Sequence, residues 1–233
     1  GELNLAASLG GDEAHIAFEL GRCKARQGNT DGAIASYTKA IELAPTDANA
    51  LLNRGFLLGR KGMMEECLAD YNRVRELKPG SGEADYQIGL LYQDSEDWQL
   101  SERYLSRCLE LEPDHQDALE NRGCARLELD NIAGAAEDFE ELLSKDPDRS
   151  YASNELADIL LTRGVDLHRA LQFSTRAVEL APREAEYWET HGEVLCALGR
   201  PAEAKESLKR ALELCTHYSP EERAELEAKI RAL

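Results

Sequence analysis

A repeat of about 34 residues constrains this chain more than any other feature of its sequence. Six equivalent positions follow one another at steps of 34, 34, 34, 34 and 35 residues, and five of them are glycine and one is alanine. They are Gly21, Gly55, Gly89, Gly123, Ala157 and Gly192. The same period relates five prolines: Pro45, Pro79, Pro113, Pro147 and Pro182. It also relates a set of small residues: Ala33, Cys67, Ser101, Ala135, Ala170 and Ala204. Three independent columns with one period predict an array of repeats rather than one or two ordinary domains.

Each repeat has the pattern of two amphipathic helices joined by a short turn. In residues 48–81, Leu51, Gly55 and Leu58 mark one helical face, and the break at Gly62 is followed by a second apolar face that begins at Cys67. A glycine in the middle of a helix costs about 1 kcal/mol in helix propensity relative to alanine. We therefore expect the second helix to approach closely at each glycine, with the small residues completing a tight crossing.

This pattern resembles that of the tetratricopeptide repeat family. The resemblance is carried by the run LLNRGFLL at residues 51–58, the turn glycine, the small residue that opens the second helix and the closing proline. An aromatic residue or leucine follows four positions after the small residue, at Tyr37, Tyr71, Leu105, Phe139 and Leu208, and Trp188 matches the large residue near the start of a first helix. The resemblance implies an all-α, right-handed α-solenoid of about six helical hairpins.

The period divides the chain into six units and two ends. The units are 14–47, 48–81, 82–115, 116–149, 150–184 and 185–216. Residues 1–13 have apolar positions where a preceding second helix would place them, so we expect the end of an incomplete helix and a natural protein that begins earlier. Residues 217–233 are expected to form a capping helix, with Ser219 and Glu222 as a capping box and an apolar stripe of Leu226, Ile230 and Leu233.

Two departures from the pattern lead to further expectations. The unit 150–184 has one extra residue between Gly164 and Ala170 and carries Ser174 at the aromatic position, so we expect a longer turn or looser packing there. Lys24 and Arg126 occupy a column that is otherwise leucine or tyrosine. We expect their aliphatic stems to pack and their charges to reach solvent.

Charge and motif content exclude several classes of function. The net charge of −18 disfavours nucleic acid and anionic membrane surfaces as partners. No apolar run is long enough to cross a membrane. The six cysteines and five histidines form no metal-ligand spacing, and no catalytic motif is present, so we expect neither an enzyme nor a cofactor. A cytoplasmic location is expected, although a removed targeting segment remains an alternative.

The family resemblance implies a concave surface, lined by the first helices, that binds peptides. One column of these helices reads Glu19, Asn53, Gln87, Asn121, Glu155 and Thr190. Its three consecutive amides can hydrogen-bond the backbone of an extended peptide without recognising the peptide's sequence, or they are ordinary surface residues. With the apolar neighbouring columns, the candidate peptide-binding residues are Phe18, Arg22, Asn49, Leu52, Asn53, Phe56, Tyr86, Gln87, Leu90 and Asn121.

Later in the chain the same columns become acidic. The candidate acidic groove consists of Asp117, Glu120, Asp158, Glu186, Glu189 and Glu193. These carboxylates either attract a partner segment rich in Lys or Arg or form an ordinary solvated face. A clamp for acidic chaperone tails is disfavoured because only Asn53 fits the residue pattern of the family members that have one.

The function expected from the sequence is a non-enzymatic scaffold or adaptor that binds a peptide segment of a partner protein in this groove. One alternative is that the array presents substrates to the catalytic domain of a larger enzyme. Another is self-assembly, in which the array binds a second copy of itself and forms a homo-oligomer.

Overall fold

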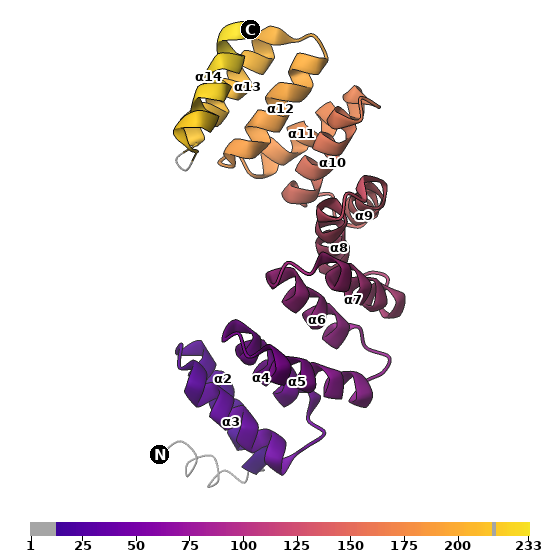
Figure 1. Ribbon diagram of the computed structural model, residues 1–233, viewed down its shortest axis with the longest axis vertical. Helices are drawn as coiled ribbons and strands as arrows, with labels where there is room; N and C mark the ends of the chain where they lie inside the picture. Colours follow the sequence, from indigo (N-terminus) through magenta and orange to yellow (C-terminus); the bar gives the residue numbers. More distant parts are fainter. Residues whose placement is uncertain (1–12, 216–217) are drawn as a thin grey trace. The chain divides into compact units, whose positions relative to one another are not determined.

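The computed structural model describes residues 13–215 and 218–233, and all the regular elements within those ranges are α-helices (Figure 1). They are α2 (Glu13–Arg26), α3 (Thr30–Leu43), α4 (Ala48–Arg60), α5 (Met64–Leu77), α6 (Glu83–Asp94), α7 (Trp98–Leu111), α8 (Gln116–Glu128), α9 (Ile132–Lys145), α10 (Ser150–Thr162), α11 (Leu167–Leu180), α12 (Ala185–Ala197), α13 (Pro201–Leu214) and α14 (Pro220–Ala232). The predicted all-α helical repeat is therefore confirmed. The helix expected within residues 1–13 falls almost wholly outside the described residues, and Glu13 belongs to α2.

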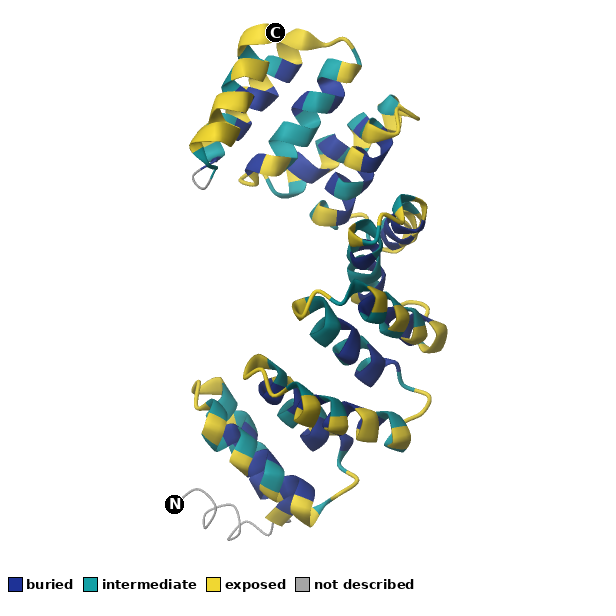
Figure 2. Ribbon diagram, in the orientation of Figure 1, coloured by how far each residue is buried: buried dark blue, intermediate teal, exposed yellow. Residues whose placement is uncertain are grey.

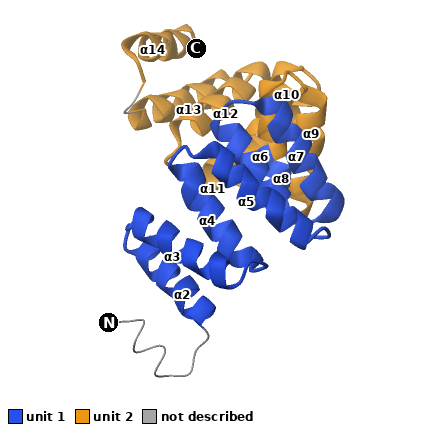
Figure 3. Ribbon diagram, turned by 60° about the horizontal axis from the view of Figure 1, so that its bottom comes forward, with its two compact units in different colours: residues 1–121 blue, residues 122–233 orange. Residues whose placement is uncertain are grey.

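The helices fall into two compact units, residues 1–121 and 122–233, with the division inside α8 (Figure 3). In the first unit α2 packs on α3, α4 on α5 and α6 on α7. In the second unit α10 packs on α11, α12 on α13, and α14 on α13. Within each unit, buried residues lie where paired helices face one another, and the turns are exposed (Figure 2).

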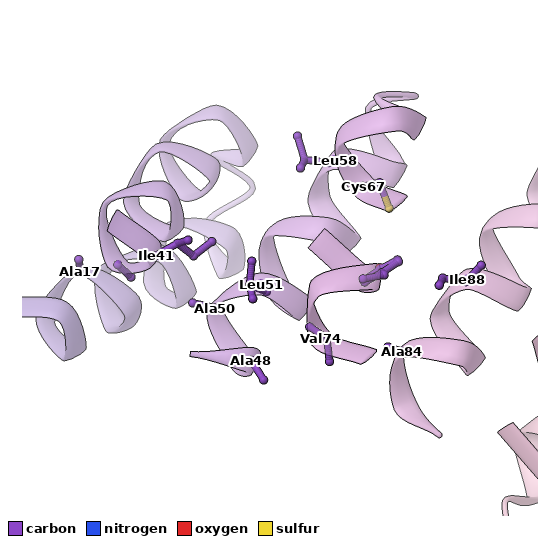
Figure 4. Packing of buried hydrophobic residues seen from close by; sticks show 12 residues of the cluster. Ala17, Ile41, Ala48, Ala50, Leu51, Leu58, Cys67, Val74, Ala84 and Ile88 are labelled. Carbon is purple, nitrogen blue, oxygen red and sulfur yellow. The ribbon is translucent and has the colours of Figure 1, made fainter. Parts of the chain in front are cut away.

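The core of the first unit runs from one hairpin into the next. Ile41, Leu51, Val74 and Ile88 come from four successive helices and are at most 8% exposed (Figure 4). They belong to a single cluster of buried apolar residues. The helical spacing of apolar residues in the sequence thus produces a core shared between repeats, in which each hairpin covers the apolar face of its neighbour.

Large side chains, rather than the small residues, lie over the glycines in the middle of the first helices. A Cβ atom at Gly55 would lie 2.7 Å from Tyr71 Cε1, and one at Gly123 would lie 2.7 Å from Phe139 Cε1. The small residues are also fully buried, as Cys67 shows at 0% exposure. The expected close approach at glycine is present, but an aromatic ring or leucine of the second helix makes it.

The turns inside the hairpins require a left-handed backbone conformation. Gly62 has φ 74° there, and the equivalent positions in the next two repeats hold Glu96 at φ 59° and Asp130 at φ 58°. A residue with a Cβ atom adopts this conformation at a cost of roughly 1–2 kcal/mol. The repeat geometry therefore imposes the turn even where the sequence lacks its glycine.

The fifth hairpin combines two substitutions at its helix crossing. Ala157 stands where the other repeats have glycine, Ser174 stands where they have an aromatic residue or leucine, and both are 0% exposed. Ser174 Oγ lies 3.0 Å from His191 Nδ1 of the next hairpin, and burial lowers the pKa of His191. The extra residue lengthens the turn as expected, and Asp166 there caps α11 by accepting a hydrogen bond from the Arg169 backbone N–H.

Buried ion pairs join the two helices of alternate hairpins. Arg54 and Arg122 each donate to an aspartate sixteen residues later, with N–O distances of 2.6 Å to Asp70 and to Asp138. Desolvation nevertheless raises the pKa of Asp138, because burial of its carboxylate outweighs the stabilisation that its arginine neighbours give. These pairs orient the helices and leave little freedom in the hairpin.

The expectation that Lys24 and Arg126 direct their charges to solvent is wrong. Arg126 Nη1 lies 2.9 Å from Asp138 Oδ2 and its side chain is only 17% exposed. Lys24 Nζ donates to Ser36 Oγ at 2.9 Å. In each case the polar residue that contacts the cation lies on the second helix of the same hairpin. The two helices are therefore joined at this position by a polar contact, where other repeats have apolar packing.

Helix α14 packs against the last hairpin. The predicted capping box is present, since Ser219 Oγ accepts from the Glu222 backbone N–H and the Glu222 carboxylate accepts from the Ser219 N–H. Leu226 is 1% exposed, and Ile230 packs partly against the same cluster. Leu233 is 37% exposed, so the stripe ends one turn earlier than expected.

Candidate functional site

Two adjoining hollows lie on the first helices of unit 1, on either side of Phe56. The first has a volume of about 260 Å³ and is formed between α4 and α6. Its lining residues are Leu52, Asn53, Phe56, Glu83 and Gln87. Four of these five residues are among the candidates from the sequence, and Glu83 is the addition.

The second hollow has a volume of about 240 Å³ and reaches between α4, α5 and α6. Candidate residues Phe56, Gln87, Leu90 and Asn121 line it, together with Gly59, Arg60, Cys67, Tyr71, Leu91, Gln93 and Asp94. Six of the ten candidates therefore surround the two hollows. We call this set the amide groove: Leu52, Asn53, Phe56, Gln87, Leu90 and Asn121.

The three amides of the groove are held by their own helices. Asn53 Nδ2 donates to the Asn49 carbonyl oxygen, and Asn121 Nδ2 donates to the Asp117 carbonyl oxygen, each at 2.7 Å. Gln87 Nε2 donates to Glu83 Oε1 at 3.0 Å. Each NH2 group has a second hydrogen, and within the described residues none of the three carboxamide oxygens accepts a hydrogen bond. The amides are thus oriented and still able to both donate and accept.

Phe56 is the most exposed large apolar side chain of the groove. It is 52% exposed, and the Arg60 guanidinium lies 6.0 Å from the centre of its ring. An aromatic ring held in solvent between two hollows offers apolar area at a low entropic cost, which is typical of a contact site. Arg60, Glu83 and Gln93 were missed from the sequence because they lie at the ends of their helices, away from the central columns.

The other four candidates of the first set lie outside the hollows: Phe18, Arg22, Asn49 and Tyr86. Phe18 packs on Tyr37 with ring centres 5.7 Å apart, so part of its surface belongs to the core. Arg22 forms an ion pair of 2.8 Å with Glu19 on its own helix.

Asn49 and Tyr86 have local partners as well. The side chain of Asn49 is exposed, and its backbone N–H donates to the capping carboxylate of Asp47 at 3.0 Å. The Tyr86 ring lies 4.5 Å from the His115 ring, centre to centre. Burial raises the pKa of the Tyr86 hydroxyl. These two residues flank the groove rather than line it.

A larger hollow, of about 520 Å³, lies in unit 2 between the α8–α9 turn and α10. The acidic candidate Asp158 lines it, together with Glu155, which the sequence placed only in the amide column. Burial and the charge of Glu193 raise the pKa of Asp158. Burial likewise raises the pKa of Glu155, and the charges of Asp158 and Glu186 add to that effect.

The last two acidic candidates are paired with the C-terminal helix. Lys229 Nζ of α14 lies 3.0 Å from Glu189 Oε1 and 2.5 Å from Glu193 Oε1. Tyr218 also donates its hydroxyl to Glu189 Oε2, at 3.2 Å. The sequence columns gave no indication of these contacts, because the partners lie 29 to 40 residues away.

The remaining acidic candidates are Asp117, Glu120 and Glu186. Asp117 and Glu186 are exposed and Glu120 is half-buried. Asp117 and Glu120 belong to unit 1, whereas Glu186 belongs to unit 2. The acidic set is therefore distributed over both units.

Comparison with known families identifies the repeat. Profiles described as tetratricopeptide repeat match residues 88–154 and 185–217, and a profile described as TPR repeat matches residues 21–62. The chain belongs to the tetratricopeptide repeat family. The matched segments of this TPR protein include α4, which carries Asn53 and Phe56, and α6 from Ile88 onward.

Solved structures of TPR proteins share the fold at low sequence identity. YrrB, described as a TPR protein with an unusual peptide-binding site, matches with a TM-score of 0.70 and 21% identity, over 84% of this chain and 98% of its own. PilF of Pseudomonas aeruginosa matches with a TM-score of 0.79 and 18% identity, over 93% and 97%. PilW, a type IV pilus biogenesis factor, matches with a TM-score of 0.70 and 20% identity, over 93% and 99%.

A search of curated proteins returns no significant match. Among the described helices of this TPR protein, none combines the length and apolar character needed to cross a membrane.

Proposed function

We propose that this TPR protein is a non-enzymatic interaction module that binds an extended peptide segment of a partner protein on the amide groove. The observation that carries the proposal is the convergence of Leu52, Asn53, Phe56, Gln87, Leu90 and Asn121 around two adjoining hollows. Three of these residues are the consecutive amides of one repeat column, and three are apolar. A surface of this composition suits main-chain hydrogen bonding with apolar side-chain contacts.

The amides have the chemistry that a peptide backbone needs. An extended strand exposes N–H and C=O groups alternately, and the carboxamides of Asn53, Gln87 and Asn121 can accept from the former and donate to the latter. Because the hydrogen bonds within each helix already fix the orientation of each amide, little side-chain entropy is lost on binding. Phe56 and the two leucines supply apolar area beside them.

The comparisons support a role in protein interaction. The family is an interaction fold, and YrrB is described as having a peptide-binding site. The excess of carboxylates, with a net charge of −18, favours a partner segment that contains Lys or Arg. The proposed partner is therefore a peptide with apolar residues for the amide groove and basic residues flanking them.

The proposal is tested with peptides selected on the protein itself. A displayed library of random twelve-residue peptides would be selected on the wild-type chain, and the selected peptides would be titrated by fluorescence anisotropy. We expect the triple variant Asn53→Ala, Gln87→Ala, Asn121→Ala to bind them at least about tenfold more weakly, since each lost hydrogen bond contributes about 0.5–1.5 kcal/mol.

The matched control replaces amides outside the groove: Asn72→Ala, Gln99→Ala and Gln172→Ala. All three are exposed on second helices. Thermal unfolding by circular dichroism checks that both triple variants fold. Peptides that bind the groove variant as tightly as the wild type would contradict the proposed function.

A further inference from the structure

A lysine bound by carboxylates of a first helix is already present in unit 2. Glu189 and Glu193 of α12 hold the Lys229 ammonium of the following helix α14, at 3.0 and 2.5 Å. Asn154 and Asp158 of α10 lie thirty-five residues before Glu189 and Glu193, the spacing that also separates the first residues of α10 and α12. Helix α10 thus keeps a carboxylate at the second of these two positions and has an asparagine at the first.

The hollow beside α10 has the composition that a long cationic side chain requires. Leu127, Ile132 and Ile159 give it an apolar wall, and Asp130, Glu155 and Asp158 bring carboxylates to the same space of about 520 Å³. Lys and Arg place an aliphatic stem along apolar surface and keep the charged group at the polar end. A shorter polar residue would leave the apolar wall uncovered.

The carboxylates of the hollow have no cation of their own. Within residues 13–215 and 218–233, no ion pair involves Asp130, Glu155 or Asp158. Arg163 also lines the hollow. However, burial raises the pKa of Asp158 and of Glu155, and the charges that add to each shift come from other carboxylates. An external cation would relieve this repulsion.

We propose that this hollow binds a Lys or Arg side chain of the partner peptide. The proposal rests on the proposed function, because it assumes a peptide partner, but it concerns unit 2 alone. Glu155 and Asp158 bind the cationic group, Asp130 contributes from the α8–α9 turn, and the apolar wall holds the stem. The hollow therefore determines specificity for a basic residue, whereas the amide groove holds backbone.

The test uses a small probe, so that it does not depend on knowing the partner. N-acetyl-lysine methylamide would be titrated into the 15N-labelled chain and followed by the amide chemical shifts of Leu127, Ile132, Ile159 and Thr162. N-acetyl-norleucine methylamide, which has the apolar stem without the charge, is the matched probe. We expect saturable shifts with the lysine probe and at least about fivefold weaker binding of the norleucine probe.

Protein variants complete the test. The double variant Glu155→Gln, Asp158→Asn should lose at least about fivefold in affinity for the lysine probe, whereas Glu221→Gln, Glu225→Gln, two exposed carboxylates of α14 with the same charge change, should retain it. Equal binding of both probes, or undiminished binding by the double variant, would overturn the proposal. The library test on the amide groove is independent of these shifts, so a failure of one site is distinguishable from a failure of the other.

Discussion

At the scale of single residues, the distance between the two helices of a hairpin depends on a glycine and the side chain that covers it. Tyr71 lies over Gly55 so closely that even a methyl group would come within 2.7 Å of its ring. The cost of glycine within a helix, about 1 kcal/mol, is offset by the burial of a whole aromatic side chain, which is 2% exposed.

Replacing Gly55 with alanine should therefore destabilise the protein even though alanine is the better helix former. We expect Gly55→Ala to lower the free energy of unfolding by about 1–3 kcal/mol through overpacking. Chemical denaturation followed by circular dichroism measures the change.

Gly59 provides a control within the same helix. A Cβ atom there would meet Cys67 Sγ and Leu91 Cδ1 at 3.4 Å, which is ordinary contact. Gly59→Ala should be neutral or should raise the free energy of unfolding by up to about 1 kcal/mol. Equal losses in the two variants would mean that the ring over Gly55 is not the cause.

The sequence predicted that the second helix approaches closely at each glycine, but it assigned the contact to the small residues, whereas a large side chain makes it. The period shows which positions are equivalent in different repeats, but it does not show which side chains touch within one repeat. Tyr71, whose ring covers Gly55, lies sixteen residues later in the sequence, on the other helix of the hairpin. The same limit explains the error at Arg126: the charge of Arg126 is paired with Asp138, in a column that is aspartate in only one other repeat and serine, tyrosine or phenylalanine in the rest. Such a pair is recognised only when both positions are compared together.

At the scale of secondary-structure elements, α14 combines a role in stability with a contact to the candidate acidic groove. Its apolar residue Leu226 is buried against the last hairpin. Its polar residue Lys229 forms ion pairs with both Glu189 and Glu193. The helix was predictable from its capping box and apolar stripe. The position of Lys229 was not, because nothing local in the sequence relates it to α12.

Loss of the Lys229 charge should loosen this helix without unfolding the array. We expect Lys229→Gln to speed amide hydrogen exchange in α14 about twofold to fivefold, since an exposed ion pair contributes about 0.2–1 kcal/mol. Exchange in α12 and α13 should change less, because their own hairpin contacts remain.

Arg231→Gln serves as the matched control. The Arg231 side chain is 70% exposed and its ionic contact, with Glu227, lies within α14 itself. Amide hydrogen exchange in α14 of the Arg231→Gln variant should stay close to that of the wild type. If Arg231→Gln loosened α14 as much as Lys229→Gln, the contact to α12 would have no special role in holding the helix.

At the scale of the whole molecule, the excess of negative charge opposes folding. The net charge is −18. Burial raises the pKa of Glu155 and of Asp158, and neighbouring carboxylates of the acidic columns add to both shifts. This self-repulsion acts through solvent and is reduced by salt.

We therefore expect the melting temperature to rise with ionic strength. Between about 10 mM and about 150 mM sodium chloride the screening length falls from about 30 Å to about 8 Å, and like-charge repulsion across the surface should weaken accordingly. Differential scanning calorimetry measures the melting temperature. A lower melting temperature at the higher salt concentration would show that the ion pairs, such as Arg54–Asp70, outweigh the net repulsion.

The covering of each glycine also has a consequence for how such arrays diversify after duplication. In the fifth hairpin the glycine has become Ala157 while the covering side chain has become Ser174, and both remain fully buried. A chimera that moved α11 into another hairpin would put a serine over a bare glycine and leave a void, whereas one that moved α10 would press a methyl group against a ring. The helices of this chain are therefore exchangeable only as matched pairs, so recombination should preserve hairpins as wholes.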